Sequence, residues 1–284
     1  MKRSHRQENG DETMNFSVLM SVYFKEKPEF LKESIESLLG QTLKPNEIVI
    51  VLDGKLTDEL YALLEEYKNA HPDLFKYVQL EQNMGLGKAL EIGIKECSYD
   101  VIARMDSDDI CHPERFEKQI NFLKNNPDVK VLGSWIGEFE ESPNKIESIR
   151  KVPSKYEEIR EYAKTRCPVN HMTVVYRKEA VLKAGSYQTL MWNEDYFLWG
   201  RMLNSNIKFM NIPEVLVYAR AGADMFNRRG GLKYFNKEVE LQKEFLKMNF
   251  IDKGTFIRNV LLRGSVRILP NALRGFIYKN MLRR

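Results

Sequence analysis

Acidic side chains follow two apolar stretches of the chain. Asp53 comes directly after EIVIVL, and Asp106, Asp108 and Asp109 come after VIARM. Carboxylates in an Asp-x-Asp pattern can turn to the same side, where they repel one another unless a cation lies between them. Mn²⁺ and Mg²⁺ bind carboxylate and phosphate oxygens together, and such a cation neutralises a leaving phosphate. The pattern therefore predicts a divalent-cation site; a solvated acidic loop or a helix N-cap is the alternative.

Strand and helix patterns alternate around these carboxylates. Short apolar runs typical of strands are separated by segments whose apolar residues recur at helical spacing. The run at 47–52 is almost wholly apolar, as expected of a parallel strand buried on both faces. The alternation predicts a doubly wound α/β sheet, whose ligands bind beyond the carboxyl ends of the strands. We expect strands at 16–22, 47–52, 77–80 and 100–105, and helices that begin at Pro28, run through Tyr61, Leu64 and Tyr67, and cover 87–97.

The second half of the chain has a more mixed pattern, without an internal repeat or a low-complexity linker. The simplest organisation is one continuous α/β domain with a mostly parallel sheet and a helical C-terminal extension. Its expected elements are a helix from Pro113, strands at 129–135 and 172–176, and helices at 194–203 and 231–250. The expected divisions are a polar, disordered lead-in at 1–14, the catalytic domain at 15–225 and the extension at 226–284.

The composition argues against several classes of protein. The chain has 284 residues, of which 43% are hydrophobic, and a formal net charge of +4, which by itself does not indicate nucleic-acid binding. Its three cysteines form neither a CxxC pair nor a disulfide framework, which favours a reducing compartment. No apolar run is long enough to span a bilayer, and the N-terminal stretch lacks the apolar region of a secretory signal. We therefore expect a cytoplasmic protein.

Several short segments follow one another in a recognisable order. They are SVLMSVY (17–23), PNEIVIVLDG (45–54), NMGLGKAL (83–90), ARMDSDDI (103–110) with PERF (113–116), NHMT (170–173) and EDY (194–196). Each is weak alone, but together they resemble the family 2 inverting glycosyltransferases of the glycosyltransferase-A fold over roughly residues 16–220. The resemblance implies a Rossmann-like nucleotide-sugar-binding domain. The implied reaction moves a hexose or N-acetylhexosamine from a UDP-sugar to a saccharide hydroxyl, as in capsule, O-antigen or exopolysaccharide assembly.

The resemblance also implies which residues bind the donor. Asp53 would contact the uracil or ribose, Asp106 the ribose or the cation, and Asp108 the cation directly. The family often has a second aspartate where Leu52 stands here, but the remaining Asp53 can still make the base contact. The residues expected to bind the nucleotide-sugar are Ser21, Tyr23, Asp53, Asn83, Lys88, Arg104 and Asp106.

Two cationic residues keep alternative interpretations. The family often has Arg-Asn where Leu90 and Glu91 stand, so Lys88 is either a substitute phosphate-side cation or an ordinary surface lysine. Arg104 lies within a predicted strand that leads to the aspartates. It is either a buried ion-pair partner of the carboxylates or a nucleotide contact.

On the acceptor side, the resemblance implies that Asp195 is the catalytic base. It would deprotonate the acceptor hydroxyl, which then attacks the anomeric carbon from the face opposite the diphosphate. Glu194 is the alternative base, and an acidic first turn of a helix is the structural alternative for the pair. Four further residues are candidates for acceptor or diphosphate contacts, with structural or loop roles as the alternatives: His171, Trp192, Arg228 and Arg229.

The chain after Asp252 contains no acidic residue, and its basic residues interleave with aliphatic ones. This pattern suits an anionic membrane surface better than nucleic acid, and a helix packed on the core is the alternative. We therefore expect peripheral attachment to the inner face of the cell membrane, near a lipid-linked acceptor. Rival functions are a nucleotidyltransferase, which would need a glycine-rich loop where YFKEKP (23–28) stands, and a non-catalytic sugar-binding module.

Overall fold

A computed structural model describes residues 14–188, 190, 193–221 and 231–268. Its N-terminal half alternates strands and helices, as the sequence predicts. Pro28 begins a helix, where its fixed φ and missing N–H are tolerated, and Thr57 caps the next by accepting a hydrogen bond from Leu60 N at 3.4 Å. The elements are β1 (Phe16–Val22), α1 (Pro28–Leu39), β2 (Glu47–Leu52), α2 (Asp58–Ala70), β3 (Phe75–Gln79), α3 (Leu86–Glu96) and β4 (Val101–Arg104).

The second half adds mostly short elements and two long strands. The short ones are β5 (Ile110–Cys111), α4 (Arg115–Asn125), β7 (Ser148–Arg150), α5 (Tyr156–Tyr162), the 3₁₀ helix η1 (His171–Thr173), β8 (Val175–Arg177), α6 (Lys178–Lys183) and α7 (Glu194–Asn204). The long strands are β6 (Val129–Phe139) and β9 (Lys208–Arg220), and the last helices are α9 (Leu232–Lys247) and α10 (Lys253–Ile268).

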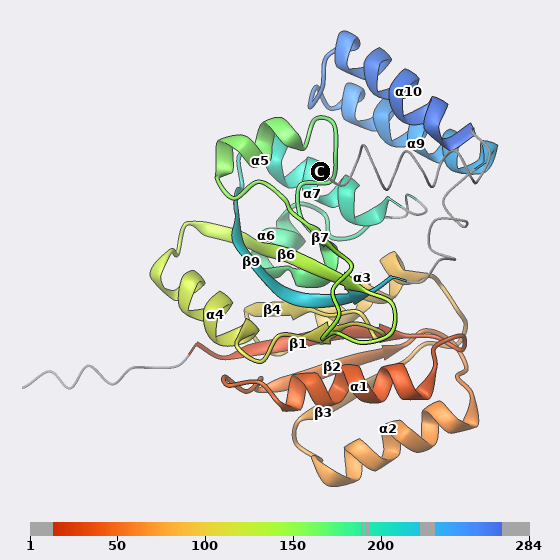
Figure 1. Ribbon diagram of the computed structural model, residues 1–284, viewed down its shortest axis with the longest axis vertical. Coiled ribbons are helices and arrows are strands. Elements are labelled where there is room, and N and C mark those ends of the chain that lie inside the picture. Colours follow the sequence, from red (N-terminus) through yellow and green to blue (C-terminus); the bar gives the residue numbers. More distant parts are fainter. Residues whose placement is uncertain (1–13, 189, 191–192, 222–230, 269–284) are drawn as a thin grey trace, which may run out of the picture.

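One mixed sheet runs through the molecule in the order β3-β2-β1-β4-β8-β6-β9-β5, with β7 beside β6. The strands β1 to β4 pair in parallel, whereas β8 is antiparallel to both of its neighbours. Helices cover both faces of the sheet (Figure 1). This arrangement confirms the predicted α/β fold, and it directs the ends of β1, β2 and β4 toward the same edge.

Side chains on opposite faces of the strands enter two separate hydrophobic clusters. Along β1, Val18 and Met20 belong to the cluster under α1, α2 and α4, whereas Leu19 belongs to the cluster under α3 and α7. All six residues of β2 are buried, which explains why that strand lacks a polar face. The nearly continuous apolar run in the sequence therefore reflects helices on both sides.

Several expected elements differ from those observed. The strand expected at 172–176 is a turn of 3₁₀ helix followed by β8, because Thr173 Oγ1 accepts a hydrogen bond from Ser134 N at 2.9 Å and donates one to Asn170 O at 2.8 Å. The helix expected from Pro113 begins at Arg115, after a turn closed by Arg115 N and His112 O. The sequence did not predict β9, whose pairing with β6 is interrupted by register shifts.

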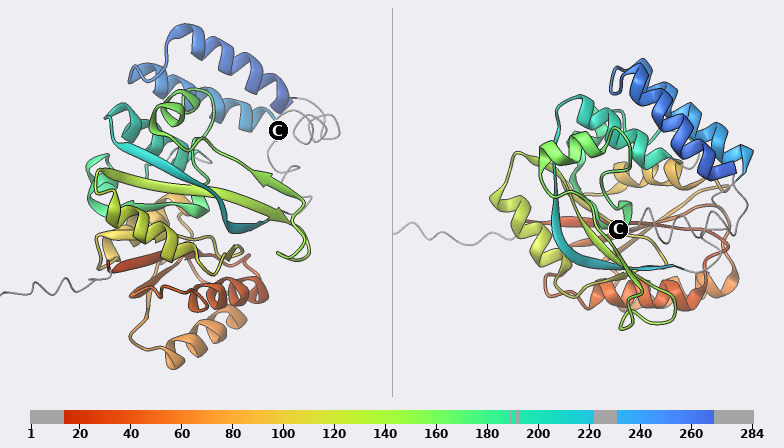
Figure 2. Two further views of the ribbon diagram at one scale, coloured as in Figure 1. Left: turned by 60° about the vertical axis from the view of Figure 1, so that its left-hand side comes forward. Right: turned by 45° about the horizontal axis from the view of Figure 1, so that its top comes forward.

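The two C-terminal helices lie side by side at one end of the molecule (Figure 2). The Phe245 ring of α9 packs edge-on against Tyr196 of α7 at 5.0 Å between centroids and fills the space over Gly200. Asn259 of α10 donates to Lys164 O at 2.8 Å. The extension therefore packs on the α/β body, while the boundary expected at 225/226 lies outside the described residues. None of the described helices combines the length and apolar character needed to cross a bilayer.

Candidate active site

Three carboxylates gather in the loop after β4, which we call the acidic loop. Asp106, Asp108 and Asp109 each offer an oxygen, and these oxygens lie within 4.8 Å of one another. Because β4 lies between β1 and β8, the loop leaves the sheet at the carboxyl end of a central strand, where doubly wound sheets bind their ligands. The sequence predicted the first two as ligands, and the structure adds Asp109 to the cluster.

The acidic loop has the chemistry of a divalent-cation site. Burial, with the charges of Asp106 and Glu26, raises the pKa of Asp108 to about 7. Burial and the two neighbouring carboxylates also raise the pKa of Asp109 well above its ordinary value. Oδ2 of Asp109 is buried and has no hydrogen-bond partner among the described residues. Hard oxygen ligands that repel one another, one of them without a hydrogen-bond donor in the described part of the chain, fit Mn²⁺ or Mg²⁺.

Arg104 lies buried beside this cluster at the end of β4. Its guanidinium forms an ion pair with Asp106, while its Nε and Nη1 atoms have no hydrogen-bond partner within the described part of the chain. The same charge acts on His171, Tyr187 and Asp195. The ion-pair interpretation of Arg104 therefore agrees with the structure. Its contact with a nucleotide stays a prediction.

Neighbouring side chains hold the backbone of the acidic loop and of the end of β4 before it, and the sequence assigned a role to none of them. Ser34 Oγ of α1 donates to Asp106 O at 3.0 Å. Arg115, wholly buried, donates to Arg104 O at 2.7 Å. Arg220, at the end of the unpredicted strand β9, reaches the loop from the other side. Only Arg115 gave a sequence signal, as part of the segment PERF.

Asp53 connects the end of β2 to the loop before α3. Its Oδ1 accepts a hydrogen bond from Met84 N at 2.7 Å and its Oδ2 accepts one from Gly85 N at 3.1 Å. The Asn83 side chain donates to Asp53 O at 3.3 Å. Gly85 then caps α3 with φ of +83°, a conformation that favours glycine. Both carboxylate oxygens thus shape the loop before α3, and a contact of Asp53 with uracil or ribose stays a prediction.

The other predicted donor-side residues lie near the same edge. Ser21 is half-buried near the end of β1, and Tyr23 follows it with 39% of its surface exposed. Lys88 forms an ion pair with Glu91 at 2.6 Å, which in turn pairs with Lys95 at 3.0 Å. These ion pairs along α3 agree with the interpretation of Lys88 as an ordinary surface lysine.

Glu194 and Asp195 form the first turn of α7. Burial raises the pKa of Asp195, although the hydrogen bond from its own helix and the charge of Arg104 oppose this. The Cys167 thiol lies 3.8 Å from Asp195 Oδ2. The side chain of Glu194 covers Gly87 of α3, so the acid pair lies against the helix that follows the Asp53-bound loop. The structure therefore brings the predicted bases beside α3, next to the loop predicted to bind the donor.

His171 is half-buried beside the predicted acceptor side. Its Nε2 lies 2.7 Å from Tyr187 Oη, and its ring packs edge-on against Trp199. Burial and the charge of Arg104 lower the pKa of His171 well below its ordinary value, which favours the neutral ring. These contacts suit a structural histidine. Three other acceptor-side candidates lie outside the described residues: Trp192, Arg228 and Arg229.

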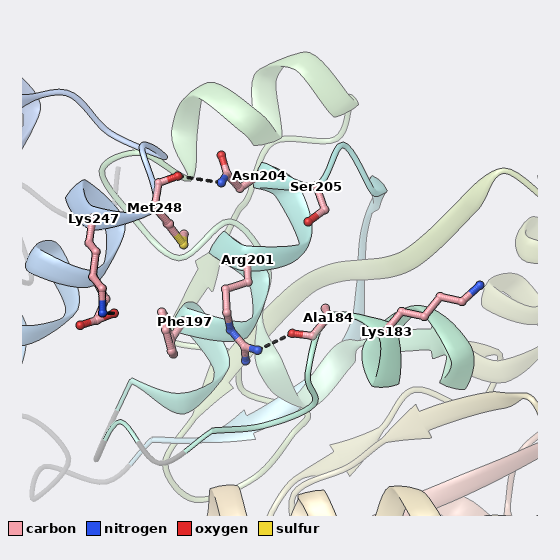
Figure 3. A pocket seen from close by; sticks show the side chains of 9 residues that line it. Lys183, Ala184, Phe197, Arg201, Asn204, Ser205, Lys247 and Met248 are labelled. Carbon is pink, nitrogen blue, oxygen red and sulfur yellow. Dashed lines mark hydrogen bonds and ion pairs between the residues drawn. The ribbon is translucent and has the colours of Figure 1, made fainter.

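A hollow of about 470 Å³ lies between α6, α7 and α9 (Figure 3). Phe197 and Arg201 line one side, and Lys247 and Met248 line the other. Arg201 stacks over Phe197 at 4.7 Å and donates to Ala184 O. None of the predicted site residues lines this hollow, so it is separate from the acidic loop.

Sequence comparison identifies relatives over almost the whole chain. A relative from Escherichia coli, "UDP-Gal:alpha-D-GlcNAc-diphosphoundecaprenol beta-1,3-galactosyltransferase", is 40% identical over 96% of this chain and 98% of that protein. "Amylovoran biosynthesis glycosyltransferase AmsE" from Erwinia amylovora is 43% identical over 93% of this chain and 98% of that protein. An "Uncharacterized glycosyltransferase" from Haemophilus influenzae is 42% identical over 95% of this chain and 100% of that protein.

Solved structures share the glycosyltransferase-A fold with this chain. S. aureus TarS 1-349 in complex with UDP superposes with a TM-score of 0.63 at 21% identity, over 94% of this chain and 74% of that one. The likeness in structure shows the fold alone. The profile of "Glycosyl transferase family 2" matches residues 17–184. Together with the relatives at 40% to 43% identity, this match shows that the chain belongs to glycosyltransferase family 2.

Proposed function

We propose that this glycosyltransferase moves a hexose or N-acetylhexosamine from a UDP-sugar to a hydroxyl of a lipid-linked saccharide during surface-polysaccharide assembly, with inversion. The observation that carries the proposal is the closeness of Asp106, Asp108 and Asp109 at the carboxyl end of β4. The E. coli relative supports the substrate classes, because its name specifies UDP-Gal and a GlcNAc-diphosphoundecaprenol.

In this proposal Asp106, Asp108 and Asp109 hold Mn²⁺ or Mg²⁺, which when bound supplies positive charge to the donor diphosphate. Asp195 takes the proton of the acceptor hydroxyl, and its raised pKa makes it a stronger base than an ordinary aspartate. The hydroxyl oxygen forms the new bond to the anomeric carbon while the bond to the diphosphate breaks on the opposite face. UDP leaves with the electron pair, and the configuration inverts.

We also propose that the C-terminal extension attaches the enzyme to an anionic membrane. Ile257, Leu261 and Leu262 of α10 are 56% to 64% exposed, which leaves aliphatic side chains facing solvent. Lys253 and Arg258 lie on the same helix, and no acidic residue follows Asp252. An apolar face with basic neighbours matches the acyl and anionic layers of a lipid surface. This location would place the enzyme beside a lipid-linked acceptor at the inner face of the membrane.

A nucleotide panel followed by a transfer assay tests the proposed reaction. Thermal stability is measured with UDP, GDP and ADP, each with and without Mn²⁺, because a ligand at about a hundredfold over its dissociation constant stabilises by roughly 2.7 kcal/mol. UDP with Mn²⁺ should give the largest shift. UDP-Gal and a GlcNAc-diphospholipid should then yield UDP and a disaccharide-lipid. Formation of UDP-sugar and pyrophosphate from UTP and a sugar 1-phosphate would instead support the nucleotidyltransferase, and sugar binding without transfer would support the non-catalytic module.

A further inference from the structure

Arg220, the last residue of β9, joins two neighbouring residues of the acidic loop. Its backbone N–H donates to Asp109 Oδ1 at 2.9 Å, and its Nε donates to Asp108 O at 3.2 Å. The loop and Arg220 are more than a hundred residues apart in the chain. A single residue therefore fixes both a carboxylate and the adjacent backbone of the loop.

The guanidinium of Arg220 is itself held on several sides. Its Cζ lies 3.9 Å from the ring centroid of Phe30 in α1 and 4.8 Å from that of Phe139 in β6. Its Nη2 forms an ion pair with Glu33 of α1 at 2.5 Å. Only 12% of the Arg220 side chain is exposed. A planar guanidinium between two rings can donate hydrogen bonds in two directions at once. The ammonium of a lysine, on a flexible side chain, cannot reproduce this.

We infer that Arg220 is a positioning residue that sets the affinity of the acidic loop for its divalent cation. Its side chain ties the Asp108 backbone to α1 and β6, and this keeps the Arg220 backbone N–H directed at the Asp109 carboxylate. The inference rests on the proposed function, since it assumes that the loop binds a cation together with UDP. Outer residues that orient metal ligands typically change metal affinity by about 10- to 100-fold when they are substituted.

Arg220→Lys tests positioning without changing charge. The Mn²⁺ concentration that half-saturates UDP binding is measured by calorimetry, at a temperature where all variants are folded. We expect this concentration to rise by about tenfold or more in Arg220→Lys. At saturating Mn²⁺, turnover should return to within about twofold of the wild type and the KM for the acceptor should stay unchanged, because Arg220 does not touch the substrates in the proposed reaction.

Arg201→Lys is the matched control. Arg201 also stacks on a ring, that of Phe197, and also donates to backbone carbonyl groups, but it lines the separate hollow (Figure 3). Its substitution should lower thermal stability without raising the Mn²⁺ requirement. If Arg220→Lys behaves in the same way, Arg220 is only structural and the inference is wrong. Absence of Mn²⁺-dependent UDP binding in the wild type would instead overturn the proposed function.

Glu33→Gln provides a second variant that should fold, since Glu33 is half exposed. It removes the ion pair with Arg220 but keeps the ring contacts and both bonds to the loop. An exposed pair contributes little, so the Mn²⁺ requirement should rise by only roughly two- to fivefold. A requirement that rises more in Glu33→Gln than in Arg220→Lys would also contradict the positioning role, because Glu33→Gln keeps both bonds to the loop.

Discussion

The side chain of Glu194 occupies the space where Gly87 has no side chain. A Cβ at Gly87 would lie 2.7 Å from Glu194 Cγ and 3.2 Å from its Cβ. Because residue 87 is glycine, the first turn of α7, which carries the predicted base Asp195, can lie close to the first turn of α3. A side chain at position 87 would clash with Glu194. The backbone loop bonded by Asp53 precedes that same turn of α3, so the elements predicted to bind the donor and the acceptor are in direct contact.

Gly87→Ala should displace the start of α7. A misplacement of about 1 Å near a reacting group can cost roughly 10²-fold in rate, so we expect turnover to fall by about tenfold or more. Steady-state assays on a soluble acceptor analogue measure this fall. Gly254→Ala in α10 is the control, because its Cβ would meet only Asp252 Oδ1 at 3.3 Å, the end of an exposed side chain that can shift. Full activity of Gly87→Ala would show that Glu194 can move without affecting the base.

Asp108→Ala should abolish the enhancement of UDP binding by Mn²⁺, together with turnover. The substitution removes one of the three clustered carboxylates and thus a predicted direct ligand of the cation. Calorimetric titration of UDP with and without Mn²⁺ gives the measurement. A variant whose Mn²⁺-dependent binding matches the wild type would remove Asp108 from the site.

Asp195→Asn should keep UDP binding nearly intact while turnover falls by roughly 10² to 10⁴, the usual contribution of a positioned base. The amide has almost the same shape but cannot accept the proton. Glu194→Gln is the matched comparison on the same turn. If it loses turnover while Asp195→Asn remains active, Glu194 is the base.

The pH dependence of turnover should also identify Asp195. Burial raises its pKa above the ordinary value of 3.8, so the base becomes protonated and inactive as the pH falls through this raised value. The acidic limb of kcat should therefore lie at a higher pH than for an exposed aspartate. The rate that remains in Asp195→Asn should lack that limb, and an identical limb in the variant would assign it to another group.

Glu47 should stabilise the fold in a pH-dependent way. It accepts hydrogen bonds from Ser17 Oγ at 2.6 Å, Ser98 N at 2.8 Å and Ser98 Oγ at 2.7 Å. Burial opposes ionisation, but these bonds outweigh it and the pKa of Glu47 lies below 4.5. The stabilisation is thus fully present above that ordinary value and is lost as the pH falls through the lower folded value.

Glu47→Gln should accordingly lower the free energy of unfolding at neutral pH by about 1–3 kcal/mol, because the amide cannot accept all of these bonds. The deficit should shrink as the pH is lowered toward the pKa of the folded state. Urea unfolding at several pH values measures it. Glu65→Gln on the exposed face of α2 is the control and should be nearly neutral. A deficit that grows on acidification would contradict the assigned direction.

Substitution of Leu261 and Leu262 by serine should weaken binding to anionic vesicles while turnover on a soluble acceptor persists. Both side chains are more than 60% exposed, so the change should barely affect the fold. Co-sedimentation with vesicles at low and high salt measures binding, and neutral vesicles serve as the control. Binding should also decrease with salt, since exposed charges are screened within about 10 Å at 0.1 M. If neither the serine substitutions nor salt alters vesicle binding, α10 is only a helix that packs on the core.

Local sequence was sufficient to predict the N-terminal half of the fold. The apolar runs of β1 and β2 and the Pro28 start of α1 were predicted at their observed limits, because each depends on residues within the element itself. The Asp-x-Asp pattern also located the acidic loop, since both carboxylates belong to one short segment. The ordered motifs identified the family for the same reason.

Tertiary structure decided which distant side chains hold that site together. Arg220 reaches Asp108 and Asp109 across more than a hundred residues, from a strand whose pairing with β6 depends on long-range register rather than local pattern. Glu194 meets Gly87 only because α7 packs on the face of the sheet that carries α3. The residue types for the chemistry could therefore be read from the sequence. Their supports could not, because packing between distant elements leaves no periodic signal in the chain.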